Sequence, residues 1–120
     1  MQEQRRILVV DDDPGIGQML TRALARHGFV VDAVTSPEEA LQRIDGSRYD
    51  AALVDLVMPG RDGAELTRLL RQRIPGLPVG MLTGYANSPL IPSSEPPGMA
   101  VFKKPVLIQD LVEFLQREIG

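Results

Sequence analysis

The sequence predicts an α/β protein whose mostly parallel sheet is covered by helices on both faces. Strand-like and helix-like patterns alternate along the chain, which is typical of this class. Several strand-like runs are apolar throughout, as expected for strands that are buried on both faces. The chain has 120 residues, enough for one domain with its own core, so we expect residues 1–120 to form a single domain.

The first strand and the first helix are well marked. Residues 6–10 form an apolar run, and Asp13-Pro14 then places an N-cap residue before a proline at the first helical position. Apolar residues follow at helical spacing, namely Ile16, Met19, Leu20, Ala23 and Leu24. We expect Gly28 to end this helix as a left-handed C-cap, because glycine adopts a positive φ without steric cost.

A second helix is predicted between the next two strands. Residues 29–34 have the composition of a strand, and Ser36 then stands three residues before Glu39. This spacing is that of a capping box, in which the two residues satisfy each other's backbone amides at the start of a helix. Residues 49–55 form the third predicted strand, and residues 58–63 are expected to form a turn.

Two further strands and two further helices are predicted in the second half of the chain. The helix after the turn has an apolar stripe made of Leu66, Leu69, Leu70 and Ile74. Residues 78–82 and 100–103 are the fourth and fifth predicted strands. The last helix presents Ile108, Leu111, Val112, Leu115 and Ile119 on one face.

The stretch between Gly84 and Gly98 is not expected to form a full helix. It contains Pro89, Pro92, Pro96 and Pro97. A proline inside a helix removes a backbone donor and clashes with the preceding turn, at a cost of about 3 kcal/mol or more. The helix that should connect the fourth and fifth strands is therefore predicted to be degenerate, with at most a short turn over residues 86–91.

Composition excludes several functional classes. The chain is 43% hydrophobic and 24% charged, as in ordinary globular proteins, and its net charge of −3 gives no indication of direct nucleic-acid binding. The absence of cysteine excludes disulfides and thiolate metal sites. No apolar run approaches the roughly 18 residues of a membrane span, and the first residues lack the apolar stretch of a signal peptide. We expect a cytoplasmic protein with no membrane partner.

The predicted strands end on chemically active side chains. Asp11-Asp12-Asp13 follows the first strand, Asp55 ends the third, and Thr83 and Lys104 follow the fourth and fifth. The carboxyl ends of parallel strands share one edge of the sheet, and ligands of open α/β sheets bind at that edge. Carboxylates, a hydroxyl and an ammonium group gathered there would suit a divalent cation and a phosphoryl group.

The acidic residues indicate a metal site. Two carboxylates about 5 Å apart repel each other by roughly 3 kcal/mol at an effective dielectric of about 20, and adding Asp55 to Asp11 and Asp12 increases this repulsion. A hard cation relieves it, and Mg²⁺ favours one or two carboxylates together with water and phosphate oxygens. Asp13 is better explained as the helix cap.

The remaining residues of this edge suit phosphoryl transfer. Asp55 can act as a nucleophile that forms an acyl phosphate, and Lys104 supplies a compact positive charge. Because side chains alternate along a strand, Lys103 and Lys104 should point to opposite sides, so that one of them reaches the site. The Lys104–Pro105 bond is a candidate cis peptide. The Thr83 hydroxyl could bond a phosphate oxygen.

These motifs, in this order and spacing, closely resemble the receiver domain of two-component response regulators. The motifs are Asp11-Asp12, Asp55-Leu56-Val57-Met58-Pro59 with Asp62-Gly63, Thr83-Gly84 and Lys104-Pro105. The resemblance covers essentially the whole chain. It implies a (βα)5 flavodoxin-like, doubly wound parallel sheet with strand order 2-1-3-4-5. It also implies a signalling phosphoacceptor rather than an enzyme, with a histidine kinase or histidine phosphotransfer protein as the phosphodonor.

The resemblance also implies a role for each residue of the site. Asp55 matches the phosphorylated aspartate, and Lys104 and Thr83 match the lysine and hydroxyl residue that contact the phosphoryl group. The Mg²⁺ ligands would be Asp55, Asp12 directly, Asp11 through water, and the backbone carbonyl of Val57. One departure concerns signalling, because Val101 occupies the position where the family usually has a switching Tyr or Phe.

Two alternatives remain open at this point. Asp11-x-Asp13 after a strand is similar to the start of Mg²⁺-dependent aspartyl phosphatases of the haloacid-dehalogenase type, in which the first aspartate attacks phosphate. That pattern normally continues with Thr or Val where this chain has Gly15, and the chain is short for that fold. The other alternative is a receiver-like binding module that signals without phosphorylation, which the altered stretch before Gly98 mildly favours.

Overall fold

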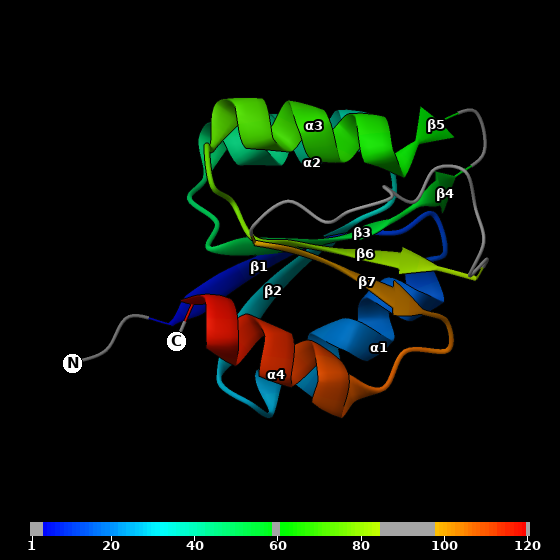
Figure 1. The fold of residues 1–120 in the computed structure, drawn as a ribbon, viewed down its shortest axis with the longest axis vertical. Helices are drawn as coiled ribbons and strands as arrows, with labels where there is room; N and C mark the ends of the chain where they lie inside the picture. The colour runs from blue at the N-terminus through cyan, green and yellow to red at the C-terminus, as the bar shows by residue number, and fades with distance from the viewer. Residues whose placement is uncertain (1–3, 59–60, 85–97, 120) are drawn as a thin grey trace.

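The predicted parallel sheet is present in the computed structural model, which describes residues 4–58, 61–84 and 98–119 (Figure 1). Its five strands are β1 (Arg5–Val10), β2 (Phe29–Val34), β3 (Ala51–Asp55), β6 (Val79–Thr83) and β7 (Met99–Lys103). They lie in the order β2-β1-β3-β6-β7, and every neighbouring pair is parallel. Counted along the chain, this is the predicted order 2-1-3-4-5.

The helices cover both faces of the sheet, as predicted. They are α1 (Pro14–Ala25), α2 (Pro37–Gly46), α3 (Gly63–Arg73) and α4 (Ile108–Ile119). Figure 1 shows α1 and α4 on one face, and α2 and α3 on the other. Two predicted caps are confirmed, because the Asp13 carboxylate accepts from the Gly15 amide at 2.9 Å and the Ser36 hydroxyl accepts from the Glu39 amide at 3.2 Å.

The core consists of two apolar clusters separated by the sheet. Alternate residues of β1 enter opposite clusters, so that Ile7 and Val9 pack toward α1 and α4 while Leu8 and Val10 pack toward α2 and α3. All four are 0% exposed, which explains why the run is apolar throughout. Burial of each such side chain stabilises the fold by about 1.5–3 kcal/mol, so the central strands are firmly held and their ends are fixed in position.

Several boundaries differ from the predictions. Gly28 has the predicted positive φ of 89°, but α1 already ends at Ala25 and two turn residues lie between them. Strand β3 begins at Ala51 rather than at Tyr49, and just before it the Arg6 amide of β1 donates to the Asp50 carboxylate rather than to a backbone carbonyl. The predicted turn over residues 58–63 includes part of a small antiparallel hairpin formed by β4 (Val57–Met58) and β5 (Arg61–Asp62).

Two further expectations concern helices. The short turn predicted over residues 86–91, and with it the degenerate fourth helix, lies outside the described residues. Within the described ranges, no helix is both long enough and apolar enough to cross a membrane.

Candidate functional site

The fold brings the three predicted metal-binding acids together. Asp11 follows β1, Asp55 ends β3, and these strands are neighbours with Val10 opposite Val54. Carboxylate oxygens of Asp11, Asp12 and Asp55 all lie within 4.8 Å of one another. Asp11 is 1% and Asp55 4% exposed, whereas Asp12 faces solvent. The cluster therefore has a buried floor of two carboxylates and one carboxylate at its mouth.

Lys104 supplies the positive charge of this cluster. Its Nζ lies 3.1 Å from Asp11 Oδ2 and 3.4 Å from Asp55 Oδ1, and its side chain is one quarter exposed. Lys103, the preceding residue, is exposed, whereas Lys104 is partly buried at the acids. The Lys104–Pro105 peptide bond is cis, as predicted. The ammonium group thus pairs with two of the three carboxylates, and the cluster keeps a surplus of negative charge.

The buried carboxylates perturb the protonation of the site. Burial, and then the charge of Asp11, raise the pKa of Asp55 from 3.8 to about 6, although Lys104 and the Val57 amide partly oppose the shift. Burial alone would lower the pKa of Lys104, but its hydrogen bond to Asp11 and the charges of Asp11 and Asp55 outweigh this effect and raise it. Lys104 therefore remains a cation, while Asp55 is ionised at neutral pH at an energetic cost.

Backbone amides fix the orientation of both buried carboxylates. The Asp13 amide donates to Asp11 Oδ1 at 2.9 Å, and the Val57 amide donates to Asp55 Oδ1 at 3.3 Å. The donor set is made of carboxylate oxygens, which suits a hard divalent cation such as Mg²⁺. A cation would also remove the surplus negative charge, so the residues present fit the predicted metal.

Thr83 lies beside Lys104. Its strand ends one residue later than predicted, at Thr83 itself. It is the last residue of β6, is 1% exposed, and its carbonyl accepts from the Lys104 amide at 2.7 Å. Val57, whose carbonyl was predicted as a ligand, begins β4 two residues after Asp55 and is 42% exposed. The structure thus places all six predicted site residues on one edge of the sheet.

Gly63 is the residue whose role at this edge was not recognised from sequence. A Cβ at Gly63 would lie 2.2 Å from the Asp55 carbonyl oxygen, so the two backbones are in direct contact. The sequence shows a glycine between Asp62 and the pattern of the next helix, but it does not indicate which residue this glycine contacts.

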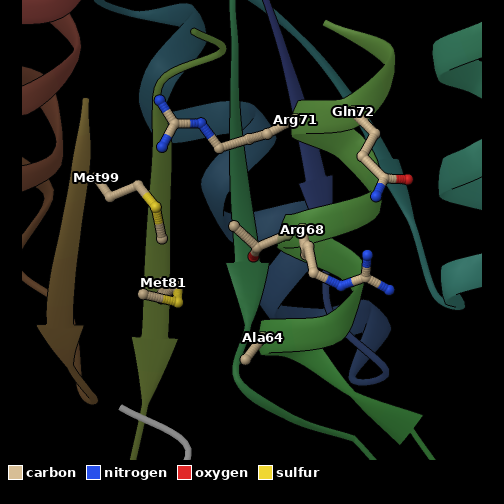
Figure 2. Close-up of a pocket in the computed structure, with 7 residues that line it drawn as sticks. Ala64, Arg68, Arg71, Gln72, Met81 and Met99 are labelled. Atoms are coloured by element: carbon tan, nitrogen blue, oxygen red, sulfur yellow. The ribbon is translucent and has the colours of Figure 1, made fainter. Parts of the chain in front are cut away.

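The apolar groove between α3 and the sheet is a different kind of concavity. Figure 2 shows Met81 and Met99 on β6 and β7, opposite Arg68, Arg71 and Gln72 of α3. The groove holds about 350 Å³, and its described lining contains no carboxylate. Phosphoryl and metal chemistry need the acids, so the acidic cluster rather than this groove is the candidate site for that chemistry.

Comparison with known proteins identifies the family of this chain. The profile of the response regulator receiver domain matches residues 7–116. The response regulator receiver protein CpdR of Brucella abortus is 33% identical over 114 residues, which cover 94% of this chain and 95% of CpdR. The transcriptional regulatory protein TcrA of Mycobacterium tuberculosis is 47% identical over 79 residues, but this match covers only 31% of TcrA, so the chain corresponds to less than half of that protein.

A solved structure agrees with both the fold and the family. The response regulator protein TrrA of Thermotoga maritima, crystallised in complex with Mg(2+)-BeF, superimposes with a TM-score of 0.84 at 30% identity, covering 96% of this chain and 99% of that one. The sheet order, the acidic edge and the match over nearly the whole chain lead to one conclusion. The chain belongs to the response regulator receiver family of two-component systems.

Proposed function

We propose that residues 1–120 act as one phosphoacceptor unit that receives a phosphoryl group on Asp55 from a phosphohistidine. The donor would be a histidine kinase or a histidine phosphotransfer protein. The observation that carries this proposal is the position of Asp55. It ends the central strand as a buried carboxylate, in contact with the Lys104 ammonium and beside Asp11.

The chemistry requires little more than position and charge. An Asp55 carboxylate oxygen forms a new P–O bond while the P–N bond of the phosphohistidine breaks, and the electron pair of that bond returns to the imidazole nitrogen. Asp55 must be ionised to attack, and a pKa of about 6 leaves it ionised at neutral pH. Lys104, whose Nζ lies 3.4 Å from Asp55 Oδ1, would neutralise the phosphoryl oxygens, which is the main requirement of phosphoryl transfer.

The acidic cluster would hold Mg²⁺. Asp12 and Asp55 are proposed as direct ligands, Asp11 as a ligand through water, and Val57 as a ligand through its backbone carbonyl. When bound, the cation neutralises charge on the phosphoryl oxygens. The choice of Mg²⁺ is supported by TrrA, a similar response regulator whose structure contains Mg(2+)-BeF.

The response to phosphorylation would start at Thr83. Its hydroxyl is proposed to move onto the phosphoryl group, because Thr83 ends β6 next to the Lys104 backbone. Val101 cannot follow with a ring movement, since it is half-buried in β7 and has a single stiff χ1 torsion. We propose a signalling role in which the domain assists its own phosphorylation and dephosphorylation, rather than catalysis on a separate substrate.

A labelling experiment tests the proposed function. The protein is incubated with Mg²⁺ and acetyl phosphate or phosphoramidate, and its intact mass is measured. We expect one added phosphoryl group, lost in Asp55→Asn and strongly reduced in Asp12→Ala. Asp45→Asn is the matched control, because Asp45 is an exposed carboxylate that pairs with Arg73 outside the site, and labelling should be unchanged.

The same experiment separates the alternatives. Phosphate mapped to Asp11 would indicate the aspartyl phosphatase mechanism instead. A folded protein that binds Mg²⁺ but takes no label from either donor or from a phosphorylated kinase would indicate a module that signals without phosphorylation.

A further inference from the structure

Gly63 makes a backbone contact that no other residue type could make. It is the first residue of α3. A Cβ built on it would lie 2.2 Å from the Asp55 carbonyl oxygen and 2.7 Å from the Leu56 Cα. Both obstacles are backbone atoms of the central strand and its exit, so no rotamer change could relieve the overlap. Any side chain would push the start of α3 away from Asp55.

This contact closes a loop on which Asp55 depends. The chain leaves Asp55, pairs Val57 with Asp62 in the β4–β5 hairpin, and returns so that the Gly63 amide donates to the Leu56 carbonyl at 2.9 Å. Val57 lies inside the closed loop, and its amide holds Asp55 Oδ1. The position of the Val57 peptide, and through it the Asp55 carboxylate, is therefore set by how the loop closes.

The α3 side of the contact is also fixed. Asp62 caps the helix by accepting from the Ala64 amide at 2.8 Å, and the Thr67 hydroxyl donates to the Gly63 carbonyl at 2.8 Å. Thr67 is 3% exposed, so this bond is shielded from water. Gly63 is thus held between a buried helical turn and the end of the central strand. A side chain added at Gly63 would therefore displace the strand exit as well as the start of α3.

We propose that Gly63 is a positioning residue of the phosphorylation site. Its contact with Asp55 and Leu56 closes the loop and thereby sets the Asp55 carboxylate and the Val57 carbonyl for cation binding and phosphoryl transfer. The inference rests on the proposed phosphoacceptor role of Asp55, but it concerns loop geometry that exists before any phosphoryl group arrives. A glycine needed only to pack α3 against the sheet would affect stability and leave the site unchanged.

Gly63→Ala tests the proposal, with Gly80→Ala as the matched control. Gly80 is also buried, and a Cβ added to it would lie 2.8 Å from Leu53 Cδ2. Unlike at Gly63, the atoms that such a Cβ would meet belong to core side chains and not to the backbone. Three quantities are measured for each variant: the unfolding free energy, the Mg²⁺ dissociation constant, and the exchange rate of the Val57 amide in metal-free protein. Labelling by acetyl phosphate is recorded as a fourth.

We expect both variants to lose stability but only Gly63→Ala to disturb the site. Its Mg²⁺ affinity should fall by about tenfold or more, as for other residues that orient metal ligands, and its Val57 amide should exchange faster. Gly80→Ala should keep the wild-type affinity and the wild-type Val57 exchange. Equal Mg²⁺ affinity and equal Val57 exchange in the two folded variants would overturn the proposal.

A second variant covers the case in which Gly63→Ala does not fold. Thr67→Val keeps the shape of the side chain and removes the hydroxyl that holds the Gly63 carbonyl. It should shift Val57 exchange and Mg²⁺ affinity in the same direction by a smaller factor, and no shift would contradict the proposal. Absence of labelling in the wild type would refute the proposed function alone, since exchange and Mg²⁺ binding test the loop without it.

Discussion

Two polar clusters on the same sheet differ in how well the fold satisfies them. In the Asp55 cluster, the buried carboxylates of Asp11 and Asp55 share the ammonium group of Lys104. In the Tyr49 cluster, made of Arg6, Asp32 and Tyr49, a single carboxylate accepts from the Tyr49 hydroxyl at 2.8 Å and lies 3.9 Å from the Arg6 guanidinium.

The protonation of the two clusters reflects this difference. Burial, with the hydrogen bond and charge of Asp32, raises the pKa of Tyr49 to about 12, so its hydroxyl stays a donor at every physiological pH. The pKa of Asp55 rises to about 6 because burial and Asp11 disfavour its charge. A cluster with enough donors stabilises the fold by itself, whereas a cluster with surplus acid is stabilised by a ligand of opposite charge.

The largest expected effect is a gain in stability for Asp55→Asn without metal. Asp55 binds a proton more tightly in the folded protein than in the unfolded chain, so its ionisation destabilises the fold. The resulting loss of folding stability is absent below about pH 4. It develops as the pH rises from 3.8 toward about 6 and is complete above that pH. Because a tenfold change in proton affinity corresponds to about 1.4 kcal/mol, the gain at pH 8 should be about 2–3 kcal/mol.

Urea unfolding in EDTA at pH 4 and pH 8 measures this gain. Asp32→Asn is the matched control, because it neutralises the carboxylate of the Tyr49 cluster. That variant should be equal to or less stable than wild type at pH 8, since Tyr49 and Arg6 lose a charged partner. A loss of stability at pH 8 for Asp55→Asn would contradict the comparison.

Much of this fold could be predicted because its strands are short apolar runs between clear caps. Ile7–Val10 is buried on both faces, and Asp13 and Ser36 accept the predicted cap bonds. The site was predictable for a related reason. Each of its residues stands at or just after a strand end, so strand order alone brings Asp11, Asp55 and Lys104 to one edge.

The remaining features depend on contacts that leave no periodic signal. The β4–β5 strands have two residues each, too few for alternation to show, and the residues around them were expected to form a plain turn. The third strand was predicted from Tyr49 but begins at Ala51, where the Arg6 amide donates to the Asp50 carboxylate, a contact between residues 44 apart that no local pattern indicates. The end of α1 was misplaced because Gly28 marks the following turn rather than the cap.

An intermediate effect is expected for Lys104→Gln on Mg²⁺ binding. The positive charge of Lys104 offsets part of the negative charge that would attract a cation. Its removal should therefore tighten Mg²⁺ binding by about tenfold, or about 1.4 kcal/mol, at pH 8. Labelling by acetyl phosphate should fall in the same variant, because the phosphoryl oxygens lose their ammonium partner.

Lys103→Gln is the matched control for charge. It removes the same positive charge from an exposed position, where solvent screens it, so affinity and labelling should both stay near wild type. Weaker Mg²⁺ binding in Lys104→Gln would mean that Lys104 organises the acids rather than competing with the cation for them.

The smallest effect is expected in the cluster that the fold already satisfies. Tyr49→Phe removes one hydrogen bond to a carboxylate, and because Asp32 is partly exposed the expected loss is about 1 kcal/mol, below the roughly 1.5–3 kcal/mol of a hydrogen bond to a charged group. Combining it with Asp32→Asn in a double-mutant cycle isolates the coupling between the two residues. The coupling should be favourable, independent of Mg²⁺ and constant from pH 6 to 9, because the Tyr49 hydroxyl does not ionise in that range. A coupling that changed with Mg²⁺ would show that the two clusters communicate through β1 and β3, and the separation between a structural and a functional cluster would then fail.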